Sequence, residues 1–61
     1  MELKEGLEFY RRCLEYCKQS MTELIKDKSI PKERKDALID KLLDRMVEFQ
    51  KRIETIEELL R

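Results

Sequence analysis

Residues 26–36 read KDKSIPKERKD, and this stretch holds the only proline of the chain. Pro31 suits the first position of a helix, where its missing N–H needs no partner, and it restricts Ile30 to extended conformations. Glu33 complements the positive end of the helix that follows, and the lysines before the break complement the negative end of the helix that precedes it. We therefore predict two helices, at about residues 2–28 and 31–60, joined by a loop at about residues 29–30.

Each predicted helix carries apolar residues at alternating spacings of four and three, the repeat of a coiled-coil seam. A short connection makes consecutive helices antiparallel, so the two seams face each other over about 40 Å at 1.5 Å per residue. The predicted fold class is therefore all-α, an antiparallel two-helix hairpin that forms one unit over residues 1–61. The seam residues are Leu3, Leu7, Tyr10, Leu14, Cys17, Met21 and Leu24 in the first helix and Ile39, Leu42, Met46, Phe49, Ile53, Ile56 and Leu60 in the second.

The seam does not use all of the apolar surface of the first helix. Phe9, Cys13 and Tyr16 lie on one shoulder of the seam and widen the apolar arc to about 200°, twice what one partner helix covers. A chain of 61 residues is also near the lower size limit for an independent core. We therefore expect the hairpin to complete a three-helix bundle as part of a longer chain, or a dimeric four-helix bundle as a homo-oligomer.

The composition argues against several classes of function. Fourteen basic and fourteen acidic residues cancel, so no net charge attracts nucleic acid or an anionic membrane. The apolar runs are too short to span a bilayer, and we expect a cytoplasmic protein without a transmembrane segment. The chain has no histidine and a single glycine, which leaves no imidazole base and no phosphate-binding loop. We expect neither an enzyme nor a cofactor.

Cys13 and Cys17 are four residues apart on the first helix, and their side chains run side by side, which disfavours a disulfide between them. Two thiols without a histidine supply only half of the ligands of a zinc site. Cysteines of a cytosolic protein are expected to be reduced. We interpret both as small buried hydrophobic residues and predict no metal site.

Two segments resemble a known family. EGLEFYRRCLEYCKQSM, at residues 5–21, is similar to the second helix of MIT (microtubule-interacting and trafficking) domains, and LLDRMVEFQKRIETI, at residues 42–56, is similar to their third helix. The resemblance implies a three-helix bundle, and no segment of these 61 residues matches its first helix. The matching positions are Glu5, Gly6, Leu7, Tyr10, Cys13, Leu14 and Ser20 in the first segment and Leu42, Arg45, Val47, Phe49, Arg52, Ile53, Glu54 and Ile56 in the second.

The resemblance gives a role to small residues that recur every seven positions. In the family they allow a neighbouring helix to approach closely, because side-chain size sets the distance between helix axes. Here Gly6 and Cys13 replace the usual alanines, and Ser20 continues the row. Together with Phe9 and Tyr16, this row is the face that we predict a missing helix or a second copy to cover.

The resemblance also implies binding of helical tail motifs of ESCRT-III proteins in a groove between the two helices. The second helix is apolar at Leu43 and Val47 and acidic further along, which suits an amphipathic helix that carries leucines and an arginine. We predict Glu54 as the salt-bridge partner of that arginine. The same stripe equally fits the shoulder of an ordinary helical bundle. The predicted partner-binding residues are Lys18, Ile25, Leu43, Val47, Gln50, Glu54 and Glu57.

Two further hypotheses stay open. In the first, the hairpin dimerises itself or a parent chain, or acts as a small regulator that occupies the helices of another protein; the wide apolar arc favours it. In the second, the hairpin is appended to an enzyme and raises the effective concentration of that enzyme at its substrate. The MIT-like module is our main hypothesis, and the self-associating hairpin is the alternative.

Overall fold

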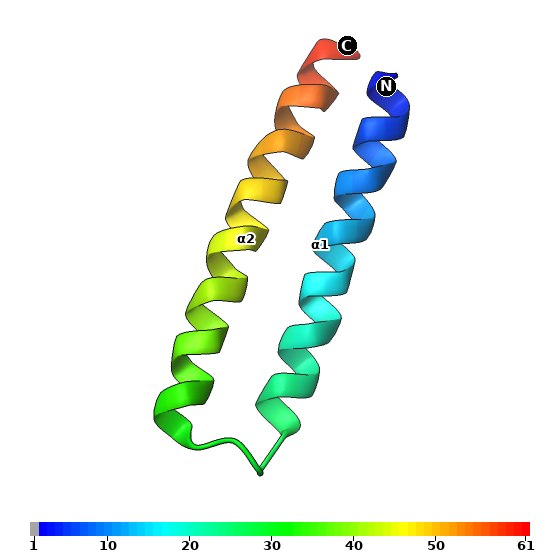
Figure 1. Ribbon diagram of the computed structural model, residues 1–61. Helices are drawn as coiled ribbons and strands as arrows, with labels where there is room; N and C mark the ends of the chain where they lie inside the picture. The colour runs from blue at the N-terminus through cyan, green and yellow to red at the C-terminus, as the bar shows by residue number, and fades with distance from the viewer. Residues whose placement is uncertain (1) are drawn as a thin grey trace.

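Residues 2–61 are described by the computed structural model. Two α-helices, α1 (Leu3–Lys26) and α2 (Lys32–Leu59), run antiparallel and side by side (Figure 1). The Cα atoms span 44 × 16 × 14 Å, so the molecule is a narrow rod with both chain ends at one end and the connection at the other. The predicted all-α antiparallel hairpin is confirmed.

The core is the seam between the two helices, and it is thin. Among the described residues the only buried apolar side chains are Leu7, Cys17 and Ile53, which are 9%, 6% and 5% exposed. The other predicted seam residues are half-buried, apart from the exposed Leu3 and Leu60 at the open end. A helix with a single neighbour covers one stripe of its surface, so the flanks of that stripe stay in contact with solvent.

Aromatic side chains join the helices in the half of the hairpin that carries the chain ends. The ring centroid of Tyr10 lies 5.5 Å from that of Phe9 and 6.1 Å from that of Phe49 on α2. The guanidinium carbon of Arg52 lies 5.6 Å from the Tyr10 centroid, over the face of the ring, where the ring quadrupole attracts a cation. Residues 9 and 10 of α1 therefore lie at the height of residues 49–52 of α2.

The connection is longer than the two residues predicted, because α1 ends at Lys26 and not at residue 28. Asp27 Oδ1 accepts a hydrogen bond from the backbone N–H of Ser29 at 2.8 Å and another from the Ser29 hydroxyl at 2.6 Å. A side chain that bonds the backbone two residues on forms a turn that competes with the helix. The prediction that the first helix continues to residue 28 is therefore wrong.

The sequence pattern predicted Pro31 as the first residue of the second helix, but α2 begins at Lys32 and Pro31 is the N-cap residue before it. Its backbone is extended, with φ −57° and ψ 146°, and its carbonyl accepts the backbone N–H of Lys35 at 2.9 Å. The Lys35 ammonium in turn donates to the carbonyl oxygens of Ile25, at 3.4 Å, and Asp27. The last carbonyls of a helix lack partners within it and carry partial negative charge. Lys35 thus caps the end of α1 from the beginning of α2.

The thin core gives a first prediction. Ile53→Ala is expected to lower the free energy of unfolding by about 2–5 kcal/mol, because it removes buried methyl groups and leaves a cavity. Ile25→Ala is the matched control, since Ile25 is 58% exposed and the same atoms are removed. Urea unfolding followed by far-UV circular dichroism measures both. Equal effects of the two substitutions would show that the seam does not hold the helices together.

The turn gives a second prediction. The Ser29 hydroxyl and backbone N–H, with the nearby Lys35 ammonium, hold the pKa of the Asp27 carboxyl below its ordinary value of 3.8. A lowered pKa in the folded chain means that the ionised carboxylate stabilises the fold above pH 3.8, and that this contribution is lost as the pH falls through the lowered pKa.

Asp27→Ala is therefore expected to lower the thermal midpoint of unfolding at neutral pH. The difference in midpoint between this variant and the unmodified chain should become smaller below about pH 4. Thermal unfolding over a pH series measures this difference. Asp44→Ala is the control, because Asp44 is exposed and makes no side-chain hydrogen bond with the described residues. A difference for Asp27→Ala that stays constant through the acid range would contradict the role given to the carboxylate.

Candidate functional site

An open groove runs along one side of the seam, with a volume of about 500 Å³. Its floor is apolar, and its most exposed apolar side chains are Leu43 and Val47, at 44% and 53%. Charged and amide groups form its edges. We call this surface the groove; its lining residues are Leu14 and Lys18 of α1 and Leu43, Met46, Val47, Gln50, Lys51 and Glu54 of α2.

Most of the predicted partner-binding residues meet in the groove. Lys18 comes from α1, and α2 contributes the others, because positions three, four and seven apart share one side of a helix. Two predicted residues lie elsewhere: Ile25 and Glu57 do not line the groove. The residues that do line it as predicted are Lys18, Leu43, Val47, Gln50 and Glu54.

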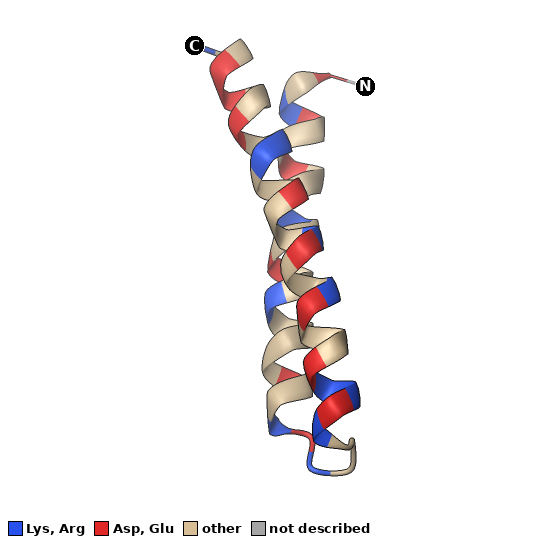
Figure 2. Ribbon diagram, turned by 90° about the vertical axis from the view of Figure 1, so that its left-hand side faces the viewer, with Lys and Arg blue, Asp and Glu red and all other residues tan. Residues whose placement is uncertain are grey.

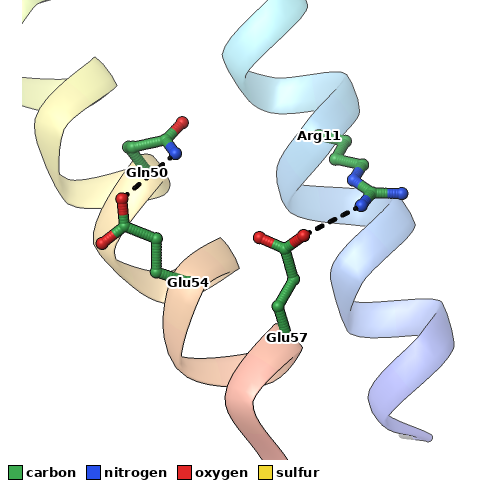
Figure 3. Close-up of polar contacts among 4 residues, drawn as sticks. All are labelled: Arg11, Gln50, Glu54 and Glu57. Atoms are coloured by element: carbon green, nitrogen blue, oxygen red, sulfur yellow. Dashed lines mark hydrogen bonds and ion pairs between the residues drawn. The ribbon is translucent and has the colours of Figure 1, made fainter. Parts of the chain in front are cut away.

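Glu54 and Glu57, in the C-terminal part of α2, have different partners (Figure 3). Glu57 points across to α1, where its Oε2 lies 3.4 Å from Arg11 Nη2. Both side chains are about half exposed, so the pair contributes at most about 1 kcal/mol. Glu54 points along α2, and its Oε1 accepts a hydrogen bond from Gln50 Nε2 at 3.3 Å. Within residues 2–61, Glu54 has no basic side chain within ion-pair distance.

Three lining residues were not predicted as part of the site. Leu14 and Met46 were assigned to the seam alone, but a groove between two helices has the seam as its floor. Lys51 is one turn after Val47 and one turn before Glu54, and this spacing is the signal that places it on the same side of α2.

A second hollow, of about 470 Å³, lies on the other flank of the seam. It shares no lining residue with the groove. Phe9 and Tyr16 are its most exposed apolar side chains, at 53% and 71%. We call this surface the aromatic face; its lining residues are Phe9, Arg12, Cys13, Tyr16 and Cys17 of α1 and Arg45 and Phe49 of α2.

The residues predicted to face a missing helix or a second copy are only partly brought together. Phe9, Cys13 and Tyr16 share the aromatic face, and Ser20 lines a neighbouring hollow of about 310 Å³ with Leu24, Leu38, Lys41, Leu42 and Arg45. Gly6 is buried within the hairpin itself. Gly6 has no side chain and exposes almost no surface. It therefore does not form part of the face for a missing helix or second copy, contrary to the prediction.

Charges of both signs alternate along the two helices (Figure 2). Residues 2–61 contain no group of three or more histidine, cysteine, aspartate or glutamate side chains placed to hold a metal ion. Neither α1 nor α2 has a stretch that is both long and apolar enough to cross a membrane.

The two thiols differ in accessibility, which gives a third prediction. Both cysteines are free; Cys17 is buried in the seam, and Cys13 is half-buried on the aromatic face. Labelling of dilute native protein with a maleimide is expected to show a fast phase from Cys13 and a slow phase limited by opening of the hairpin. Cys13→Ala should remove only the fast phase, as mass spectrometry would measure. A single phase in the unmodified chain, at the rate of the urea-unfolded protein, would contradict this burial.

Models of known protein families, curated proteins and solved structures were compared with the chain, and none of them matches it. What the hairpin binds has to be inferred from its own surfaces.

Proposed function

We propose that the chain is a protein-interaction module, without catalysis or cofactor, that binds an amphipathic helix of another protein in the groove. The observation that carries this proposal is the exposure of Leu43 and Val47 at the centre of an apolar groove whose edges are charged. These residues are one helical turn apart. A bound helix presents side chains at the same spacing, so it covers both at once.

The charges of the groove define the rest of the ligand. Glu54 lies beyond the apolar floor, and its only side-chain hydrogen bond among the described residues is to the uncharged Gln50. A ligand arginine suits this carboxylate because a guanidinium forms two parallel hydrogen bonds with it. Lys18 and Lys51 on the edges favour acidic residues on the outer side of the ligand. The ligand is therefore a helix with a leucine face and an arginine beside it.

The resemblance of the two helices to the second and third helices of MIT domains supports the choice of ESCRT-III tail motifs as candidate natural ligands. In this proposal Glu54 has the role that the resemblance implies, and its place on the groove is consistent with that role. A single helical motif covers less area than a standard protein interface, so we expect binding in the micromolar range, at roughly 8 kcal/mol.

The fourth prediction is a charge-exchange experiment. Fluorescence anisotropy measures binding of labelled helical peptides that have a leucine face and one arginine, either ESCRT-III tails or a designed sequence. Glu54→Lys is expected to weaken binding about tenfold or more, because a charged hydrogen bond is replaced by repulsion. A peptide with glutamate in place of its arginine is expected to bind Glu54→Lys more tightly than it binds the unmodified chain.

Two further variants separate the groove from the rest of the surface. Val47→Glu is expected to abolish binding of both peptides, because it places a carboxylate on the apolar floor. Asp44→Lys is the matched control for the charge reversal, since it lies on α2 outside the groove and should leave the affinity unchanged. Absence of saturable binding, or equal effects of Glu54→Lys and Asp44→Lys, would refute the proposal.

A further inference from the structure

The aromatic face leaves large apolar side chains exposed to solvent. Phe9 and Tyr16 are more than half exposed, and each stands one turn from Cys13. Exposed clusters of this kind on small proteins mark interaction surfaces. Cys13 and Ser20 between and beside them are small, so long side chains do not hold a second helix away from α1.

We infer that this face is covered by a second copy of the chain, in a four-helix bundle whose two-fold axis runs parallel to the helices. In this arrangement α1 of each copy packs on α2 of the other, and every helix has only antiparallel neighbours. The groove is on the opposite flank and shares no lining residue with this face. The inference therefore does not depend on the proposed function.

The symmetry determines which residues meet. Rotation about an axis parallel to the helices leaves each residue at its own height along the bundle. Within one copy, Tyr10 contacts Phe49 and Arg52, and the aromatic face gathers residues 9–17 of α1 with residues 45–49 of α2. Residues 9–17 of one copy consequently face residues 45–52 of the other.

One pair of opposite charges meets at each outer edge of the face in this arrangement, and Arg45 of α2 lies nearer its centre. Arg12 and Glu48 are exposed, lie at the same height, and stand on the outer edges of α1 and α2. The rotation places Arg12 of each copy beside Glu48 of the other, so the pair occurs twice. Further along the same edges are Glu23, three turns after Arg12, and Lys41, two turns before Glu48. The same rotation places these two opposite charges on facing helices, about one helical turn apart in height.

The other two-fold arrangement is disfavoured by the same charges. An axis across the helices, placed at the height of the aromatic face, would pack α1 on α1 and α2 on α2. Arg12 would then lie beside Arg12 of the second copy, and Glu48 beside Glu48, so both contacts would be repulsive. Charge complementarity therefore selects the axis parallel to the helices.

The flank of the rod that carries the aromatic face is long enough for a stable dimer. The broad side of the rod measures 44 × 16 Å between its outermost Cα atoms, or about 700 Å², so two copies packed along its full length would bury about 1,400 Å² in total. Specific protein interfaces bury about 1,200–2,000 Å². A dimer would therefore bury a standard interface, and it would cover the apolar surface that the seam leaves exposed.

The test is an exchange of charges between copies, and it is our fifth prediction. The unmodified chain is expected to sediment as a dimer at micromolar concentration. Arg12→Glu and Glu48→Arg each place like charges together twice. The dimer dissociation constant of each variant alone should therefore rise, by up to about tenfold. An equimolar mixture should regain the affinity of the unmodified chain, because both pairs in the mixed dimer are again opposite in charge.

A second pair of variants tests the apolar part of the face. Tyr16→Glu is expected to abolish the dimer and to keep the helical circular dichroism and peptide binding, because Tyr16 is 71% exposed in the single chain. Val47→Glu in the groove should do the reverse and leave the dimer intact. The inference would be overturned if the unmodified chain were still monomeric at a concentration about 100-fold above the micromolar range. It would also be overturned if the mixture of Arg12→Glu and Glu48→Arg dimerised as weakly as each variant alone.

Discussion

The packing of one apolar stripe of α1 against one of α2 is the constraint on which the rest of the structure depends. With a single neighbour, each helix buries little: Leu7, Cys17 and Ile53 are the buried apolar side chains of residues 2–61. The same constraint produces both exposed flanks of the seam. A third helix within the chain would bury more apolar surface, but it would cover one of these flanks. The thin core and the two exposed apolar flanks therefore have one cause.

The fold was predictable because helical periodicity and one proline determine it. The alternating spacing of four and three identified the residues that face across the hairpin, and burial confirms them except at Leu3 and Leu60 at the open end. The end of α1 was not predictable from periodicity, because a local bond from Ser29 to the Asp27 carboxylate decides it. The only sequence signal for that turn is a serine two positions after an aspartate, at Ser29 and Asp27.

The groove itself was predicted from the resemblance to MIT domains, and spacing along the helix assigned residues of α2 to one side of it. Val47 and Glu54 were assigned in this way, and Lys18 was predicted on the opposing wall. Glu57 was assigned wrongly to the groove, because its partner Arg11 is 46 positions away in the sequence and periodicity within one helix carries no information about it. Cross-helix contacts depend on the relative height of α1 and α2. That height follows from the three-dimensional packing of rings such as Tyr10 and Phe49.

The two chain ends lie together at one end of the rod, and this has a mechanical consequence. A pulling force applied to both ends does not shear the whole seam at once. It peels the helices apart one layer at a time, starting beside the contact between Arg11 and Glu57 and reaching the Lys35 cap last. Peeling breaks few contacts at any moment, so the hairpin should yield at low force. A neighbour that bridges both helices would resist this opening, because it holds several layers together at the same time.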